Sequence, residues 1–303
     1  MESLGRHVSE EFATMRRFLE EREHELQRDL ADYAAGLLQP LEDNLRTIQR
    51  ALISVQKDII YCQAVVNQWD SRRFLQEFKW LKERPHEDIH CPAVVSAKPC
   101  LGVFKGPLRY RVWKEMRNCI SPAPASLTLD PNTANAWLQL EEDLTGARAG
   151  ETRQEVPDDP GRFDPSPCVL GSEGFGSGRH YWEVEVQDKT EWAVGVARET
   201  APRKGDIALS PRDGFWSIWL RRGADYRALT SPPTRLAPDP RPDRVGVYLD
   251  YEGGQVSFYD ADCMAHLFTF TAAFSERLYP FFSPGLREGR RNQTPVRVRH
   301  LRL

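Results

Sequence analysis

An unbroken heptad pattern in the first third of the chain is the feature that most limits how it can fold. Nine residues recur at alternating steps of four and three, and we call these positions the seam: Leu41, Leu45, Ile48, Leu52, Val55, Ile59, Cys62, Val66 and Trp69. Apolar residues at this spacing are typical of a helix that packs along a second helix. A helix cannot bury such a stripe alone, so the pattern predicts self-association.

The same spacing extends toward the N-terminus with one gap at Arg22. Its positions are Phe12, Met15, Leu19, Leu26, Leu30, Tyr33 and Leu37. The steps from Tyr33 to Leu37 and from Leu37 to Leu41 are both four residues, which interrupts the alternation of four and three. This stutter coincides with Gly36 and Pro40, where we expect the helix to relax or bend. Residues 1–84 together predict a helix of about 80 residues, which would extend roughly 120 Å.

From about residue 107 the pattern changes to short alternating runs separated by turns. Apolar residues alternate with polar ones around Trp182 and Trp192, so both tryptophans face the predicted core. The pair Gly253-Gly254 separates two further runs and predicts a hairpin. Many short strands with frequent turns indicate an all-β sandwich or barrel.

Composition excludes several classes of function. The formal net charge of −3 gives no overall attraction to nucleic acid or to an anionic membrane. The six cysteines form no C-x-x-C pair, and only His90 and Cys91 are neighbours, so we expect no zinc site and no cofactor. We find no signal peptide and no apolar run long enough for a membrane span. Free thiols in a cytoplasmic location are the simplest expectation.

Several segments of the second half resemble a known domain in the order in which they occur. Residues 127–134 look like the opening of a PRY segment. Six later segments resemble the core of a SPRY domain: residues 178–186, 192–197, 214–220, 245–251, 256–259 and 279–285. Residues 74–84 are similar to the end of the coiled coil in tripartite-motif (TRIM) proteins. The chain therefore resembles the C-terminal part of a TRIM-family E3 ubiquitin ligase.

The resemblance implies a fold and a division into domains. It implies a long α-helical coiled coil over residues 1–84, a linker over 85–106, and an all-β PRY-SPRY (B30.2) sandwich of two antiparallel sheets over 107–303. It also implies that two copies pair as an antiparallel homodimer. The zinc-binding RING finger and B-box domains with which TRIM ligases begin have no counterpart in this sequence. We therefore expect targeting and dimerisation from this chain, and ubiquitin transfer only from a catalytic end that it lacks.

Two alternatives for the function stay open. The chain can be a RING-less adaptor or an isoform that pairs with a full-length TRIM homologue and blocks it. It can also bind RNA through a group of arginines near the C-terminus: Arg287, Arg290, Arg291, Arg297, Arg299 and Arg302. Few aromatic residues lie among these arginines, so the interpretation as a solvated face is simpler. The motifs do not assemble a Ser/His/Asp set or a pair of catalytic carboxylates.

The resemblance also implies which residues contact a protein substrate. In PRY-SPRY domains the contacts come from loops at one end of the sandwich, usually joined by the variable PRY loop, here about residues 145–159. The candidate ligand-binding residues are Asp188, Lys189, Trp219, Arg221, Leu286, Arg287 and Glu288.

Trp219 is the candidate that the residues themselves support. It lies three positions after Trp216, so in a strand the two side chains face opposite sides, one in the core and one free to be exposed. An exposed tryptophan beside arginines has the composition of an interface hot spot. The alternative is that Trp219 packs under a neighbouring loop. Some relatives carry a second aromatic residue where this chain has Arg221, and its absence favours a more polar or acidic ligand surface.

Overall fold

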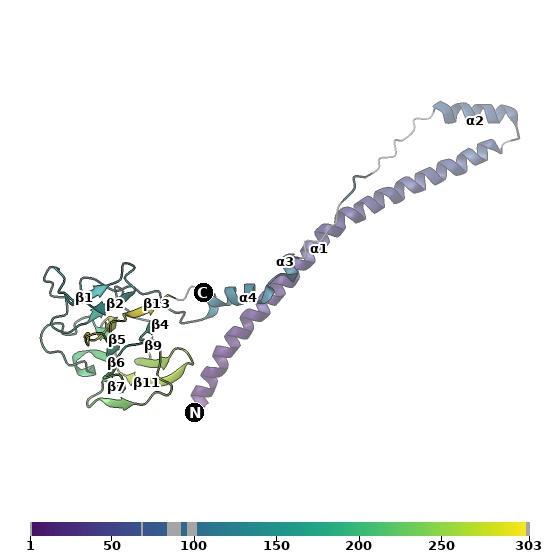
Figure 1. Cartoon of the computed structure of the whole chain (residues 1–303). Coiled ribbons are helices and arrows are strands. Elements are labelled where there is room, and N and C mark those ends of the chain that lie inside the picture. Colours follow the sequence, from purple (N-terminus) through teal and green to yellow (C-terminus); the bar gives the residue numbers. More distant parts are fainter. Residues whose placement is uncertain (1, 68, 84–91, 96–101, 301–303) are drawn as a thin grey trace. The chain divides into compact units, whose positions relative to one another are not determined.

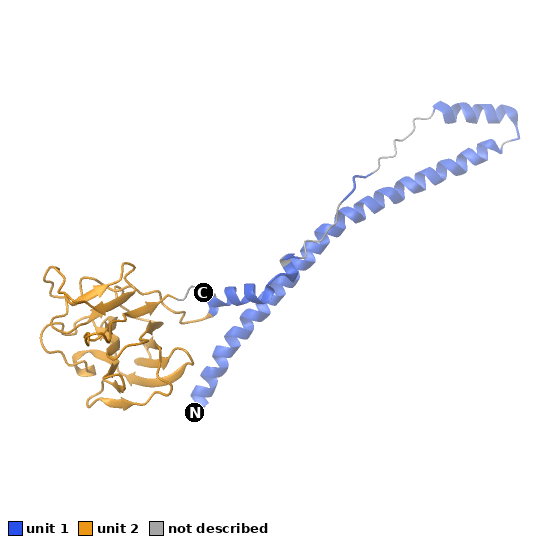
Figure 2. Cartoon of the chain, in the orientation of Figure 1, with its two compact units in different colours: residues 1–119 blue, residues 120–303 orange. Residues whose placement is uncertain are grey.

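The computed structural model describes residues 2–67, 69–83, 92–95 and 102–300. The chain forms two compact units that divide between Cys119 and Ile120 (Figure 2). This division differs from the boundary expected at residue 107, because helix α4 (Leu108–Met116) belongs to the first unit. Of the expected linker, residues 85–91 and 96–101 lie outside the described residues.

The first unit is dominated by one long helix, which confirms the prediction that this part of the chain is helical. Helix α1 (Glu2–Val66) contains 65 residues and extends roughly 100 Å (Figure 1). It passes through Gly36 and Pro40 without interruption. Pro40 cannot donate a hydrogen bond to the carbonyl of Gly36, and a glycine at that position leaves the backbone free to adjust around the proline ring.

Helix α1 ends at Val66 and a second helix begins at Ser71, which corrects the expectation of a single helix to residue 84. Asp70 begins helix α2 (Ser71–Glu83), because its Oδ1 accepts a hydrogen bond from the Arg72 amide at 3.0 Å. The rings of Tyr61 and Trp80 meet edge to face with centroids 5.6 Å apart. Helix α2 therefore packs against the end of α1.

Two short helices and a 3-10 turn complete the first unit. They are α3 (Gly102–Lys105), α4 and η1 (Arg117–Cys119). The Nε atom of Arg22 lies 2.6 Å from Oε2 of Glu115, and the rings of Tyr33 and Phe104 have centroids 5.8 Å apart. These contacts hold α3 and α4 against the N-terminal half of α1.

The second unit consists of two antiparallel sheets, which confirms the predicted sandwich. The larger sheet contains, in spatial order, β1 (Leu138–Leu140), β2 (Gly146–Ala149), β13 (Val296–Arg299), β4 (Arg179–Glu185), β9 (Arg244–Asp250), β10 (Gln255–Asp260) and β11 (Ala265–Thr271). The smaller sheet contains β3 (Val169–Leu170), β12 (Leu278–Ser283), β5 (Trp192–Arg198), β6 (Phe215–Arg221), β7 (Asp225–Ala228) and β8 (Thr234–Leu236). A short 3-10 turn, η2 (Pro211–Asp213), precedes β6.

The main core lies between the two sheets. Trp182 in β4 and Trp192 in β5 are 0% and 1% exposed, so both are core residues as predicted. The predicted hairpin joins β9 to β10, with Asp250 paired to Gln255. Gly254 adopts a φ of +63° in the turn, a conformation that favours glycine over any other residue. Within the described ranges, no helix has the length and apolarity needed to cross a bilayer.

Candidate functional site

The side chains of β6 alternate between the main core and the opposite face of the six-stranded sheet. Trp216, Ile218 and Leu220 are buried in the main core. Trp219 lies on the opposite face, half-buried, and pairs across the sheet with Ala193 of β5. The prediction that Trp216 and Trp219 face opposite sides of the strand is therefore confirmed. Trp219 is left on a surface where loops, and not the second sheet, surround it.

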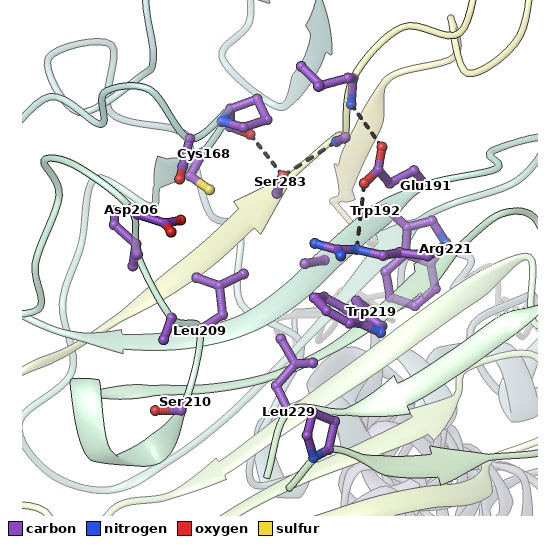
Figure 3. A pocket seen from close by; sticks show the side chains of 18 of the residues that line it. Cys168, Glu191, Trp192, Asp206, Leu209, Ser210, Trp219, Arg221, Leu229 and Ser283 are labelled. Carbon is purple, nitrogen blue, oxygen red and sulfur yellow. Dashed lines mark hydrogen bonds and ion pairs between the residues drawn. The ribbon is translucent and has the colours of Figure 1, made fainter. Parts of the chain in front are cut away.

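A cavity of about 560 Å³ opens on this face. Its apolar lining comes from strands and from the loops that follow β5, β7 and β12, and includes Ala193, Ile207, Leu209, Trp219, Leu229 and Leu286. Ser166, Ser210, Thr230 and Ser283 also line the cavity, and Figure 3 shows Ser210 and Ser283 among the apolar side chains. An apolar floor with a few polar groups around it is the usual composition of a ligand-binding pocket.

Arg221 covers the indole of Trp219. Its guanidinium carbon lies 3.6 Å from the ring centre, which is the geometry of a cation–π contact. Arg221 Nε lies 3.7 Å from Oε1 of Glu191, and Glu191 Oε2 accepts a hydrogen bond from the Leu286 amide at 3.3 Å (Figure 3). Glu191 therefore links three of the predicted contact residues into one wall of the pocket.

The opposite side of the pocket carries an acidic residue. Asp206 lies in the loop between β5 and β6, and its carboxylate points into the space between that loop and Arg221 (Figure 3). Asp206 is exposed and has no hydrogen-bond or ion-pair partner among the described residues. It is free to pair with a group that enters the pocket.

The inner end of the pocket is chemically inert. The Ser283 hydroxyl donates a hydrogen bond to the carbonyl oxygen of Pro167 at 2.8 Å, so its proton is committed to the backbone. Burial raises the pKa of the Cys168 thiol to about 12, which keeps it protonated at neutral pH. Neither residue has the activated form that nucleophilic catalysis requires.

Asn292 ties together the two loops that form one rim of the pocket. Its buried Nδ2 donates to the carbonyl oxygens of Pro284 at 3.0 Å and Leu286 at 2.9 Å. Its Oδ1 accepts from the amides of Thr190 at 3.1 Å and Glu191 at 3.3 Å. We call this set of bonds the Asn292 clamp. It fixes the loop before β5 against the loop after β12.

Three of the seven predicted contact residues line the pocket, namely Trp219, Arg221 and Leu286. Asp188, Arg287 and Glu288 lie in the adjoining loops and outside the cavity lining. The Thr190 hydroxyl is 3.3 Å from Glu288 Oε2, and Arg287 pairs with Glu151 of the PRY loop. These contacts place both residues beside the Asn292 clamp.

Lys189 does not fit the role expected of it. Its side chain is 0% exposed, and its Nζ donates a hydrogen bond to the carbonyl oxygen of Thr294 at 2.7 Å. Burial lowers the pKa of the ammonium group from its ordinary 10.5 to about 8. A side chain with no exposed area cannot contact a partner, so the surface role predicted for Lys189 is wrong. It holds the loop from inside.

Sequence reasoning missed Glu191, Asp206 and Asn292. Glu191 directly precedes Trp192, so its position at the start of a predicted strand was a usable signal. Asp206 and Asn292 lie in loops without periodicity, and their roles depend on segments that are distant in the sequence.

Three arginines near the C-terminus pair with carboxylates in the part of the chain that the structure describes, whereas Arg290 and Arg291 are exposed and have no carboxylate partner there. Arg297 Nε lies 2.8 Å from Glu141 Oε2, and Arg299 lies 3.8 Å from Glu185. Arg287 pairs with Glu151. Arg302 lies outside the described residues. These carboxylates offset much of the positive charge on which the RNA-binding hypothesis depends.

No group of three or more histidine, cysteine, aspartate or glutamate side chains within the described ranges could hold a metal ion. The arrangement of the pocket is instead suited to binding, since it joins an apolar floor, two tryptophans and three charged groups.

Comparison with protein families identifies two adjoining matches. Residues 179–296 match the SPRY domain, and residues 127–175 match the SPRY-associated domain. The two matches include every residue of the sandwich that lines the pocket.

Similarity to known proteins extends beyond the sandwich. The chain is 43% identical to "Nuclear factor 7, ovary" of Xenopus laevis over 97% of its own length and 49% of that protein. It is 42% identical to "E3 ubiquitin-protein ligase TRIM69" of Rattus norvegicus over 98% of its length and 60% of that protein. The chain thus spans about half to three-fifths of these relatives. The crystal structure of the TRIM65 PSpry domain superposes with a TM-score of 0.50 at 25% identity, covering 69% of this chain and 100% of that domain.

Proposed function

The chain belongs to the SPRY-domain family, and we propose that it recognises a protein partner through the Trp219 pocket and pairs with a second copy through helix α1. The observation that supports this most directly is the pocket wall, in which Arg221 stacks on a half-buried Trp219 and Glu191 joins both to the loop after β12. Tryptophan and arginine are the residues most often found at the energetic centre of protein interfaces.

The partner is a segment of a protein that places an apolar side chain on the pocket floor. The floor is apolar, and the surrounding hydroxyls and charged groups are suited to peptide backbone and polar side chains. The loops that carry Asp188, Arg287 and Glu288 adjoin the pocket and extend the contact surface around it.

Helix α1 supports the second part of the proposal. Four seam residues, Leu45, Ile48, Leu52 and Ile59, are each at least half exposed on the helix. An apolar stripe of this length is unstable in water and is stabilised by a second helix. We propose an antiparallel homodimer, or the same pairing with a full-length TRIM homologue. Two linked pockets then bind a multivalent target with higher avidity than one.

The name of one relative supports a proposed place for the chain in ubiquitin chemistry. One relative is named as an E3 ubiquitin-protein ligase, and this chain matches 60% of that protein. We propose that the chain acts as the targeting and dimerising part of such a ligase in the cytoplasm. A RING-less adaptor that blocks a full-length homologue is the competing proposal. Co-precipitation with a RING-bearing homologue, followed by a ubiquitylation assay of that homologue, separates the two.

Proximity labelling in cells tests the recognition site. The wild-type chain is compared with Trp219→Ala and with Trp137→Ala, a control that removes another tryptophan, 47% exposed, outside the pocket lining. We expect a set of labelled proteins that is lost in Trp219→Ala and retained in Trp137→Ala. If both variants retain every labelled protein, the pocket is not the recognition site.

A further inference from the structure

We propose that the pocket selects a peptide segment in which a lysine or arginine lies close to an apolar side chain, with the cation paired to Asp206. The inference rests on the proposed function and names the chemical class of its ligand. It differs from the more polar or acidic ligand surface that was expected because position 221 carries no second aromatic residue.

The charges around the pocket carry this inference. Among the described residues, three charged ones line the cavity, namely Glu191, Asp206 and Arg221. Arg221 is already engaged on two sides, because it lies 3.6 Å over the Trp219 ring and 3.7 Å from Glu191. Its positive charge is therefore offset within the protein, and the remaining charge in the pocket is the carboxylate of Asp206.

The position of Asp206 makes this charge available to a ligand. Its loop continues directly into Ile207 and Leu209, which belong to the apolar lining. The carboxylate lies across the pocket from Arg221 (Figure 3). A ligand whose apolar side chain rests on Leu209 and Trp219 therefore brings its neighbouring residues beside Asp206. A cation there gains an ion pair, whereas a carboxylate meets a like charge.

The geometry also explains why Arg221 does not attract an acidic ligand. Glu191 lies between Arg221 and the loop after β12, and it accepts the Leu286 amide as well. An incoming carboxylate that approaches Arg221 therefore also meets the like charge of Glu191.

Selection from a random peptide library displayed on phage tests the proposal with the whole chain as bait. Four baits are used: wild type, Asp206→Asn, Asp206→Lys, and Glu173→Gln as a control. Glu173 is exposed and does not line the pocket. Peptides are counted as pocket ligands only when Trp219→Ala loses them, and circular dichroism checks that each variant is folded.

We expect the pocket ligands of the wild type and of Glu173→Gln to carry lysine or arginine within two residues of an apolar or aromatic side chain. Asp206→Asn should bind these peptides roughly twofold to fivefold more weakly, since an exposed ion pair contributes little more. Asp206→Lys should select peptides with aspartate or glutamate instead.

The failures are distinguishable. Pocket ligands without an excess of basic residues, or a basic preference that Asp206→Lys leaves unchanged, overturn the inference and leave the proposed function standing. If no selected peptide depends on Trp219, the proposed recognition site fails and the inference fails with it.

Discussion

The guanidinium carbon of Arg221 lies 3.6 Å above the ring centre of Trp219, and this one contact decides the character of the pocket. The arginine shields the indole from water and is at the same time held 3.7 Å from Glu191. The aromatic anchor and its charged neighbour are thus positioned before any partner arrives. Preorganisation of this kind lowers the entropy lost on binding.

Replacing Arg221 by alanine tests whether the stacked pair acts as a unit. The cation–π contact contributes about 0.5–1 kcal/mol at an exposed site, so Arg221→Ala should lower the free energy of unfolding by about that amount. Urea unfolding measures it. The variant also removes the cation that offsets Glu191, which keeps only the hydrogen bond from the Leu286 amide, so the pocket should prefer basic peptides more strongly than the wild type. An unchanged preference would show that Glu191 does not contribute charge to the pocket.

The Asn292 clamp should control the shape of the pocket rim. Asn292→Gly keeps the positive φ of +54° accessible but removes the side chain. The change leaves buried backbone groups unpaired, and we expect it to cost about 1–3 kcal/mol of folding free energy. Hydrogen–deuterium exchange should accelerate at Thr190 and Glu191, whose amides bond to Asn292.

Asn132→Gly provides the matched control for the clamp. Asn132 is exposed, and its side chain has no hydrogen-bond partner among the described residues. This control accounts for the entropy that glycine adds to the unfolded chain. Equal exchange at Thr190 in both glycine variants and in the wild type would contradict the clamp.

Alternating strands could be predicted from the sequence, whereas loop contacts could not. Burial of Trp182 and Trp192 follows from a period of two that any strand imposes. The end of α1 at Val66 was missed because the heptad spacing continues through Trp69, beyond the residue where the helix stops. Lys189 was expected on the surface because the resemblance assigns its loop to partner contacts, and its burial depends on Thr294, more than a hundred residues away.

The buried Lys189 should make stability depend on pH. Its pKa is about 8 in the folded chain and 10.5 ordinarily, so between these values the unfolded chain binds more protons. The contribution of Lys189 to stability therefore rises with pH across that window. Relative to Lys189→Met, the wild type should gain about 2 kcal/mol between about pH 7 and about pH 9.5. Urea unfolding at both pH values measures the gain, and a constant difference between the two proteins would refute it.

The seam should hold two copies of α1 together. Leu45 and Leu52 are 55% and 56% exposed on the helix, so a partner helix must cover them if the seam is an interface. The double variant Leu45→Glu with Leu52→Glu removes four leucines from a homodimer and places charges there. The free energy of dimerisation should become less favourable by about 6 kcal/mol or more, which raises Kd by roughly four orders of magnitude. Sedimentation equilibrium should then find a dimer for the wild type and a monomer for this variant. Arg50→Gln with Lys57→Gln makes the same change in net charge at exposed positions on the helix face opposite the seam and should stay dimeric. A seam variant that remains dimeric would place the interface elsewhere.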